Sequence, residues 1–147
     1  MPGLEEIIPV TKEADIRSAF DLMRHLRAHL TDPDVFFNQV MRQFESGYRL
    51  AGLRKADQWL GLVGFRVTEN LLYGRFVYVD DLIVHPGSQN QGIGRKLIET
   101  CRNQAIQLGC ANLVLDTGLH MAYAQRFYFR QGLLAEGLHF VEQLQES

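Results

Sequence analysis

The stretch that most constrains this chain is rich in glycine and lies between two contrasting patterns. It consists of Gln89, Asn90, Gln91, Gly92, Ile93 and Gly94. Before it, residues 77–84 form an apolar run typical of a strand, and after it a helical pattern begins at about Arg95. A turn from a strand into a helix exposes backbone N–H groups, and the first helical turn adds the positive end of the helix dipole. The stretch therefore predicts a strand, loop and helix that together bind a pyrophosphate group.

The hydrophobic pattern of the whole chain predicts a mixed architecture. Helices are expected at 13–30, 35–44, 95–108 and 120–131. Strands are expected at 7–10, 48–53, 59–67, 76–84 and 111–116, and Phe140 and Val141 are expected in a closing strand. This order predicts an α/β fold of mixed α+β character, with a central twisted mixed sheet of about six to seven strands flanked by about four helices. No composition shift marks a linker, so we expect a single domain over 1–147.

Composition fits one enzyme-sized core. The chain has 147 residues, of which 46% are hydrophobic and 22% are charged. A net charge of -2 gives no general electrostatic footprint for nucleic acid. No apolar run approaches the ~20 residues of a membrane helix, and the first residues lack the regions of a secretion signal. We therefore expect a cytoplasmic protein with no nucleic-acid or membrane partner.

The cysteines and the paired histidines do not indicate a metal site. Cys101 and Cys110 lie nine residues apart in one helical pattern and cannot meet within that helix, so in an intracellular protein we expect both to be reduced packing residues. Neither has the CxxC spacing of metal ligands. His25 and His29 could share a helix face, but the glutamate of a zinc-protease helix is missing beside the first histidine. We expect no bound metal.

Four interpretations compete for the glycines at 92 and 94. A Walker A loop requires lysine and then serine or threonine after its second glycine, which this chain lacks. A dinucleotide fingerprint requires a third glycine where Leu97 stands. A plain turn, in which the glycines only redirect the chain, remains open. The pattern Q-x-x-G-x-G, followed by two basic residues, places amide donors and cations at one helix start and favours a phosphate site.

Two motifs in this order resemble the GNAT superfamily of acetyl-CoA-dependent N-acetyltransferases. The family's pyrophosphate loop reads Q/R-x-x-G-x-G/A, here residues 89–94, and its later helix reads A-x-x-F-Y-x-x-x-G-F, here residues 124–133. The run at 78–86 also resembles the family's fourth strand. Three positions depart from the family pattern, Asn90, Met121 and Leu133, and none removes a backbone donor from the loop. The resemblance implies the acyl-CoA N-acyltransferase fold, in which strands four and five splay apart.

The resemblance also implies acetyl-CoA as the co-substrate, lying between the splayed strands. The amides of Leu82, Ile83 and Val84 would bind its pantetheine arm like an added strand, and one of them would act as an oxyanion donor. The pyrophosphate would lie against Gln89, Asn90, Gln91, Gly92, Ile93, Gly94 and Arg95.

The resemblance further suggests three catalytic residues, Tyr128, Asp80 and Asp81. Tyr128 matches the family's tyrosine and would protonate the departing thiolate; the alternative is an aromatic residue that packs the last helix. For the base we prefer Asp80, whose alternative is a structural carboxylate beside a basic neighbour; many family members use ordered water instead. Because neighbouring strand residues face opposite sides, Asp80 and Asp81 are not expected to face one cleft, whereas Tyr78 and Asp80 are expected to share a face.

The function implied is an N-acetyltransferase that moves an acetyl group to a primary amine of a small molecule or a peptide by direct attack in a ternary complex. A non-catalytic acyl-CoA-binding regulatory module is the alternative, and a nucleotide-binding domain using the same loop is a third candidate. The adjacent aspartates hint at a cationic amine, and Arg24, His25 and His29 are expected near the acceptor. Members of the family often pair through sheet edges or C-terminal strands, so a homodimer is expected.

Overall fold

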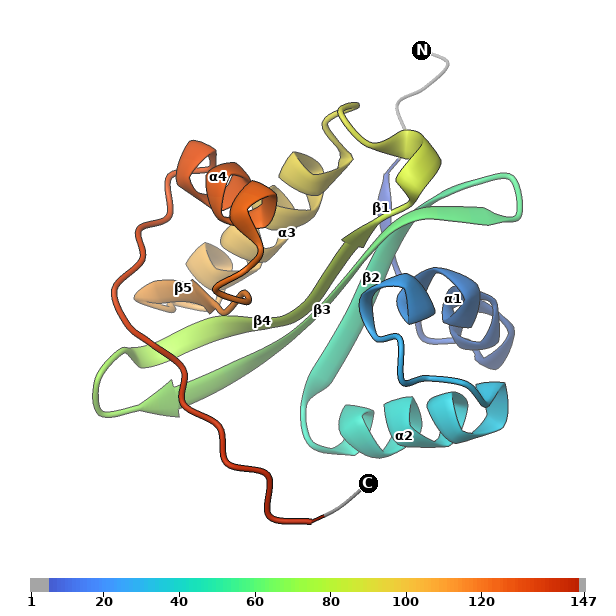
Figure 1. Ribbon diagram of the computed structural model, residues 1–147, viewed down its shortest axis with the longest axis horizontal. Helices are drawn as coiled ribbons and strands as arrows, with labels where there is room; N and C mark the ends of the chain where they lie inside the picture. Colours follow the sequence, from blue (N-terminus) through green and yellow to red (C-terminus); the bar gives the residue numbers. More distant parts are fainter. Residues whose placement is uncertain (1–5, 146–147) are drawn as a thin grey trace. The chain divides into compact units, whose positions relative to one another are not determined.

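The chain divides into two compact units, one ending at Leu115 and the other beginning at Asp116. The computed structural model describes residues 6–145. Within that range the first unit holds the β-sheet and three α-helices, and the second holds one α-helix followed by a segment without regular structure (Figure 1). The single domain expected over 1–147 remains a prediction.

The first unit is built on a mixed sheet. Its strands are β1 (Ile7–Pro9), β2 (Tyr48–Lys55), β3 (Gln58–Asn70), β4 (Gly74–Val84) and β5 (Asn112–Leu115). They lie in the order β1-β2-β3-β4-β5. Neighbours are antiparallel except β4 and β5, which are parallel. The fold class expected from the sequence is confirmed, but the expected number of strands is too high, because this sheet has five strands among the described residues.

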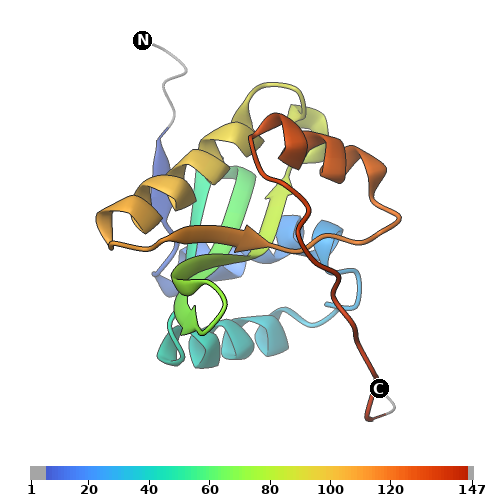
Figure 2. The same ribbon diagram turned by 90° about the vertical axis from the view of Figure 1, so that its left-hand side faces the viewer.

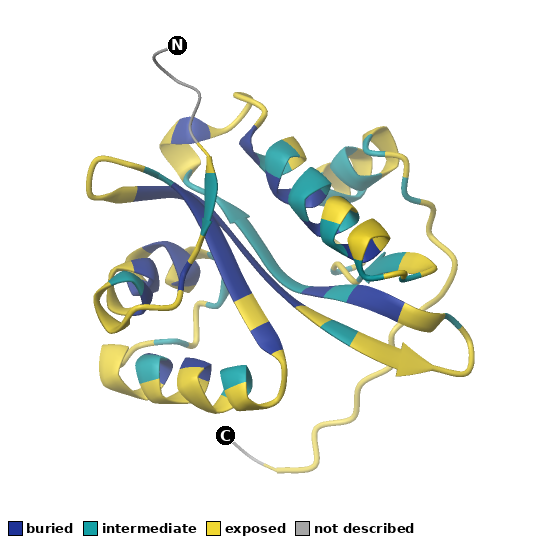
Figure 3. Ribbon diagram, turned by 180° about the vertical axis from the view of Figure 1, so that it is seen from behind, coloured by how far each residue is buried: buried dark blue, intermediate teal, exposed yellow. Residues whose placement is uncertain are grey.

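Helices cover both faces of this sheet. They are α1 (Glu13–Leu26) and α2 (Pro33–Glu45) on one face and α3 (Ile93–Gln107) on the other (Figures 1 and 2). The first unit also has a short 3-10 helix, η1 (Pro86–Ser88), which links β4 to the loop before α3. The second unit contains α4 (Ala122–Arg130). Each sheet face has its own apolar core, and buried residues concentrate along β2 and β3 (Figure 3).

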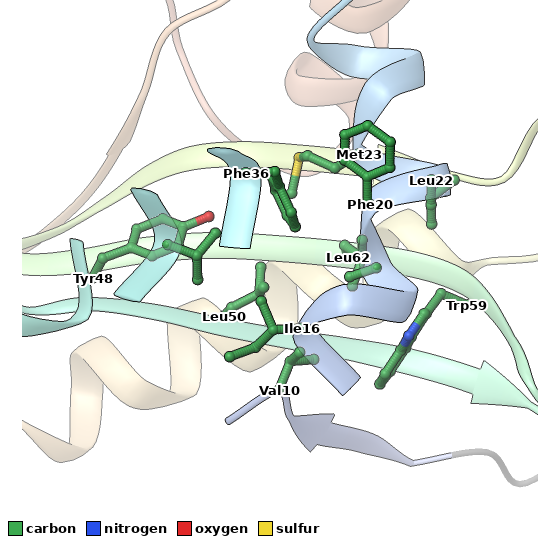
Figure 4. Close-up of a cluster of buried hydrophobic side chains, with 12 residues drawn as sticks. Val10, Ile16, Phe20, Leu22, Met23, Phe36, Tyr48, Leu50, Trp59 and Leu62 are labelled. Atoms are coloured by element: carbon green, nitrogen blue, oxygen red, sulfur yellow. The ribbon is translucent and has the colours of Figure 1, made fainter. Parts of the chain in front are cut away.

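The core under α1 and α2 follows the helical pattern of the sequence. Ile16, Phe20 and Met23 of α1 meet Leu50 and Leu62 of the sheet (Figure 4). Burying a side chain of this size contributes about 1.5–3 kcal/mol each. This packing fixes the two helices over the part of the sheet that carries the acidic pair.

The first two helices depart from their expected boundaries. The run 31–34, expected only to break the pattern, starts α2: the side chain of Asp32 accepts hydrogen bonds from the amides of Asp34 and Val35, with Pro33 in the first helical turn. The first helix ends at Leu26 rather than at residue 30. Its last turn is closed by the amide of Arg27, which donates to the carbonyl of Met23.

A β-bulge interrupts the pairing of β3 and β4. Phe65 pairs with Val79 and Gly64 pairs with Asp81, so Asp80 is an extra residue on β4. Val79 and Leu82 therefore both pack on the α3 side, whereas strict alternation would place them on opposite faces. The expectation that Asp80 and Asp81 cannot face one cleft is wrong, because both residues line the same hollow beneath α1 and α2.

The expected closing strand does not form. Residues 133–145 contain no strand, and Phe140 and Val141 are 88% and 80% exposed. A strand requires a hydrogen-bonded neighbour, and no strand of the described chain pairs with this segment.

Candidate functional site

One edge of β4 is open over the second half of the strand. The pairing with β5 covers only Phe76–Val79, and within residues 6–145 no strand pairs with that edge from Asp80 to Val84. The amide of His85 donates to the carbonyl of Leu60 at 2.7 Å. Because hydrogen-bonded and non-hydrogen-bonded pairs alternate between antiparallel strands, this bond shows which amides of β4 point towards β3. The amide of Ile83 consequently points towards β3, and the amides of Leu82 and Val84 point to the open edge. Of the three amides expected to bind the pantetheine arm, only those of Leu82 and Val84 therefore point to the open edge.

The loop after β4 adopts the backbone geometry that its glycines suggest. Asn90 and Gly92 have φ of 65° and 79°, in the left-handed region. A Cβ on Gly92 would meet nothing within 4 Å, so the space beside this residue is open. Gln89 and Gln91 are exposed beside it.

The start of α3 presents amides without helical partners. The first helical hydrogen bond runs from the amide of Lys96 to the carbonyl of Gly92 at 3.1 Å, and no side chain caps Gly92. The amides of 93–95 therefore have no acceptor within the helix, and the dipole adds positive potential there. Arg95 is exposed and donates to Glu99 at 3.0 Å, so its charge is partly matched already.

The start of α3 is held closely against the sheet. A Cβ on Gly61 of β3 would lie 2.7 Å from the side chain of Ile93, so only glycine allows this approach. Ile93 is buried, which places it in the core rather than beside a ligand. Its backbone amide remains at the helix start. The first unit thus carries two groups of backbone donors, the outward amides of Leu82 and Val84 on β4 and the amides of residues 93–95 at the start of α3.

The bulge brings both aspartates to the face under α1 and α2. Asp81 accepts from the hydroxyl of Tyr48 at 2.7 Å and from Nε of Arg27 at 3.0 Å. Asp80 accepts from Nε and Nη2 of Arg66 at 2.9 and 2.8 Å, a bidentate pair. Burial, followed by the nearby charge of Asp81, raises the pKa of Tyr48 well above its ordinary value. The hydroxyl is therefore a donor at physiological pH.

Sequence reasoning missed both the bulge and the side chains that contact the aspartates. For the bulge, one signal was available in the sequence. The apolar alternation of Val77 and Val79 resumes at Leu82 and Val84, which is a slip of one residue. Such a slip marks a bulge. The side chains that meet the aspartates come from distant parts of the chain, and no spacing in the sequence joins them.

The two aspartates line a cleft of about 310 Å³ between α1, α2 and β4. A more open hollow of about 480 Å³ adjoins it. The two hollows share the side chains of Gln39, Gln43, Tyr48 and Asp80. Of the residues expected near the acceptor, His29 lines the cleft, whereas Arg24 and His25 line neither hollow. The site therefore combines a backbone edge on one side of β4 with a polar cleft on its face.

The expected acid belongs to the second unit. Tyr128 is a half-buried residue of α4, and burial raises the pKa of its hydroxyl above the ordinary tyrosine value. Its ring contacts that of Phe127 at a centroid distance of 5.4 Å, edge to face. Both the acid and the packing interpretation are compatible with this environment.

Within residues 6–145 no three histidine, cysteine, aspartate or glutamate residues are grouped so that they could hold a metal ion. In the same range, none of the helices has the length and apolar character needed to cross a bilayer.

Comparisons with known proteins point to one family. The model of the acetyltransferase (GNAT) family matches residues 14–133. The aminoalkylphosphonate N-acetyltransferase of Salmonella typhimurium is 25% identical over 118 residues, which cover 80% of this chain and 68% of that protein.

Solved structures of low identity share the fold. The ribosomal-protein-alanine N-acetyltransferase of Brucella melitensis matches with a TM-score of 0.80 at 19% identity, covering 96% of this chain and 99% of that one. The aminoglycoside N-acetyltransferase AAC(6')-Iy in complex with CoA matches with a TM-score of 0.82 at 12% identity, covering 99% of both chains. At these identities the likeness concerns the fold alone.

Proposed function

Because the chain belongs to the acetyltransferase (GNAT) family, we propose that it transfers an acetyl group from acetyl-CoA to a primary amine by direct attack in a ternary complex. One observation carries the proposal: the open edge of β4 leads directly into a loop whose helix start offers amides without helical acceptors. This is the arrangement that an extended arm attached to a pyrophosphate requires.

The residues present fit acetyl-CoA. The outward amides of Leu82 and Val84 would hold the pantetheine arm, and the left-handed backbone at Gly92 leaves open space for the pyrophosphate. Acetyl-CoA would supply a thioester already activated for transfer to an amine. The remaining catalytic work is then to position the amine, accept its proton and return a proton to the leaving sulfur.

The acidic pair is proposed to orient the amine and receive its proton, directly or through water. Each carboxylate can accept about four hydrogen bonds, and Asp80 and Asp81 each retain acceptor capacity beside their arginine partners. Arg27, Arg66 and Tyr48 hold these carboxylates in fixed orientations. Tyr128 is proposed as the proton donor, because its pKa is raised and its hydroxyl therefore stays protonated at neutral pH.

Ligand-dependent stabilisation tests the cofactor. Acetyl-CoA and CoA should raise the melting temperature, and ATP and NAD should not, because only a ligand that prefers the folded state stabilises it. Stabilisation by ATP or NAD without any by CoA would remove the proposal.

Transfer is tested by CoA thiol release with an amine panel, followed by mass analysis of the products. The panel should include the acceptor classes named for the similar proteins: aminoalkylphosphonates, aminoglycosides and a peptide with N-terminal alanine. Asp80→Asn and Asp81→Asn should each lower kcat about tenfold or more, whereas Asp57→Asn at an exposed turn should not. Acetyl-CoA binding without transfer to any amine would favour the non-catalytic module.

We also propose that the protein acts as a homodimer in the cytoplasm. The exposed apolar side chains of the C-terminal segment, Phe140 and Val141 among them, support pairing with a second copy. Light scattering on the purified protein tests the dimer, and fractionation of cells that express it tests the compartment.

A further inference from the structure

The charges around the cleft are not those of a site for a polycation. Asp81 is paired with Arg27, and Asp80 is paired with Arg66. The two carboxylates that suggested a cationic acceptor are therefore each matched by an arginine. The pair can still accept hydrogen bonds from one amine, but it carries no surplus negative charge for a second ammonium group.

The adjoining outer hollow contains a further cation. Arg42 lines it together with Arg66 and Asp80. Arg42 is exposed, and no carboxylate of the described chain forms an ion pair with it. With Asp80 matched by Arg66, the outer hollow has one uncompensated positive charge.

The wall that α2 contributes consists of hydrogen-bond donors without a carboxylate. Gln39, Arg42 and Gln43 recur at helical spacing on one face of α2, and Ser46 follows at its C-cap. Gln39 donates to Gln43 at 3.0 Å, which orients the two amides beside Arg42. An array of amide, hydroxyl and guanidinium donors is suited to an anion.

We propose that the acceptor is a small amine that also carries a fixed anionic group, a phosphonate, phosphate or carboxylate, bound by Arg42 in the outer hollow. This inference rests on the proposed acetyl transfer. The anion lies against α2, and the amine lies towards Asp80 and Asp81 on β4. A diamine would instead place its second ammonium beside Arg42, where like charges repel.

Acceptors matched in length test the inference. CoA release is measured at saturating acetyl-CoA with 3-aminopropylphosphonate, 4-aminobutanoate, 3-aminopropan-1-ol and 1,3-diaminopropane. At least one anionic acceptor should have a kcat/KM roughly tenfold or more above that of the alcohol, and the diamine should be the poorest. Equal values, or a preference for the alcohol or the diamine, would overturn the inference while leaving acetyl transfer standing.

A charge-removing variant assigns the effect to one side chain. Arg42→Gln should raise KM roughly tenfold or more for the anionic acceptor and leave values for the alcohol within about twofold. The control is Arg49→Gln, which makes the same change of charge at an exposed residue. Arg49 precedes Leu50 and follows Tyr48 on β2, so its side chain points to the opposite side of the sheet from theirs, and it lines neither hollow. An equal loss for anionic and neutral acceptors, or an equal effect of both variants, would overturn the role of Arg42.

Failure of the proposed function has a different signature. Its outcome is a protein that folds and is stabilised by acetyl-CoA and yet acetylates no amine in either panel. That result would refute the transfer of acetyl groups to these amines and, with it, the proposed anion site. Circular dichroism and the melting temperature of each variant show whether it is folded, and the salt dependence of KM gives a second readout. KM for the anionic acceptor should rise with ionic strength in the unsubstituted protein and much less in Arg42→Gln.

Discussion

The hydroxyl of Tyr48 donates to Oδ2 of Asp81 at 2.7 Å, joining the start of β2 to the bulged part of β4. Gly64 of β3 lies between them in the sheet, opposite Asp81. A Cβ on Gly64 would overlap the hydroxyl and the ring of Tyr48. The absence of one side chain therefore makes room for the contact that orients a carboxylate of the candidate site.

Gly64→Ala should destabilise the protein by about 2 kcal/mol or more, because the buried ring of Tyr48 has no space into which it can move freely. Urea denaturation measures the free energy of unfolding. Gly137→Ala is the control, since a Cβ at that position meets nothing within 4 Å. Equal stability of the two variants would show that the ring of Tyr48 is not confined.

Stability at alkaline pH should depend on Tyr48. Its pKa is raised in the folded state, so the folded protein keeps a proton that the unfolded chain loses near pH ~10. The resulting stabilisation is complete below that pH and is lost as pH rises towards the folded pKa. Unfolding free energies measured from pH 8 to 11 should fall less steeply in Tyr48→Phe. Tyr123→Phe, at a residue that is 79% exposed, should leave the slope unchanged.

Alanine substitutions of two glycines at opposite ends of α3 distinguish an effect on acetyl-CoA binding from an effect on stability. Gly92 and Gly109 have φ of 79° and 71°, and a Cβ at either position meets nothing within 4 Å. Alanine at either site should cost about 1 kcal/mol through the left-handed backbone. Only Gly92→Ala should also weaken acetyl-CoA binding, several-fold by calorimetry, because its methyl group narrows the approach to the free amides. A comparable loss of affinity in Gly109→Ala would contradict the assignment of the loop.

Tyr128→Phe should lower kcat about 100-fold while leaving the affinity for acetyl-CoA unchanged, since a general acid contributes to the step and not to binding. Because burial raises the pKa of this hydroxyl, the alkaline limb of kcat in the unsubstituted protein should lie above the ordinary tyrosine value near ~10. Tyr123→Phe on the same helix is the matched control. Unchanged kcat in Tyr128→Phe would leave that residue only its packing role.

The strand, loop and helix around Gly92 were predictable because they depend on local rules. Glycine tolerates positive φ, and the first turn of any helix lacks acceptors for its amides. The order of strand, loop and helix can be seen in the sequence from Val77 to Arg95. The central helix begins at Ile93, two residues earlier than expected.

Strict alternation assigned the face of the later β4 residues wrongly, since one extra residue moves all later side chains to the other side, and only the slip after Val79 marks that residue. Asp81 is oriented by Tyr48 and Arg27, residues that are far away in sequence, so its environment depends on tertiary packing. The closing strand failed for a related reason. Apolar residues such as Phe140 favour extended structure, but a strand forms only where another edge accepts its hydrogen bonds.

Under the proposed function, β4 serves two molecules: its open edge binds acetyl-CoA, and its bulged face lines the acceptor cleft. Gln39, Arg42 and Gln43 of α2 line the outer hollow. Substitutions at these positions change that wall, whereas the amides at the edge of β4 belong to the backbone and stay in place. If the proposed function holds, evolution would change the acceptor by substitutions on one exposed face of α2 and leave the binding of acetyl-CoA intact.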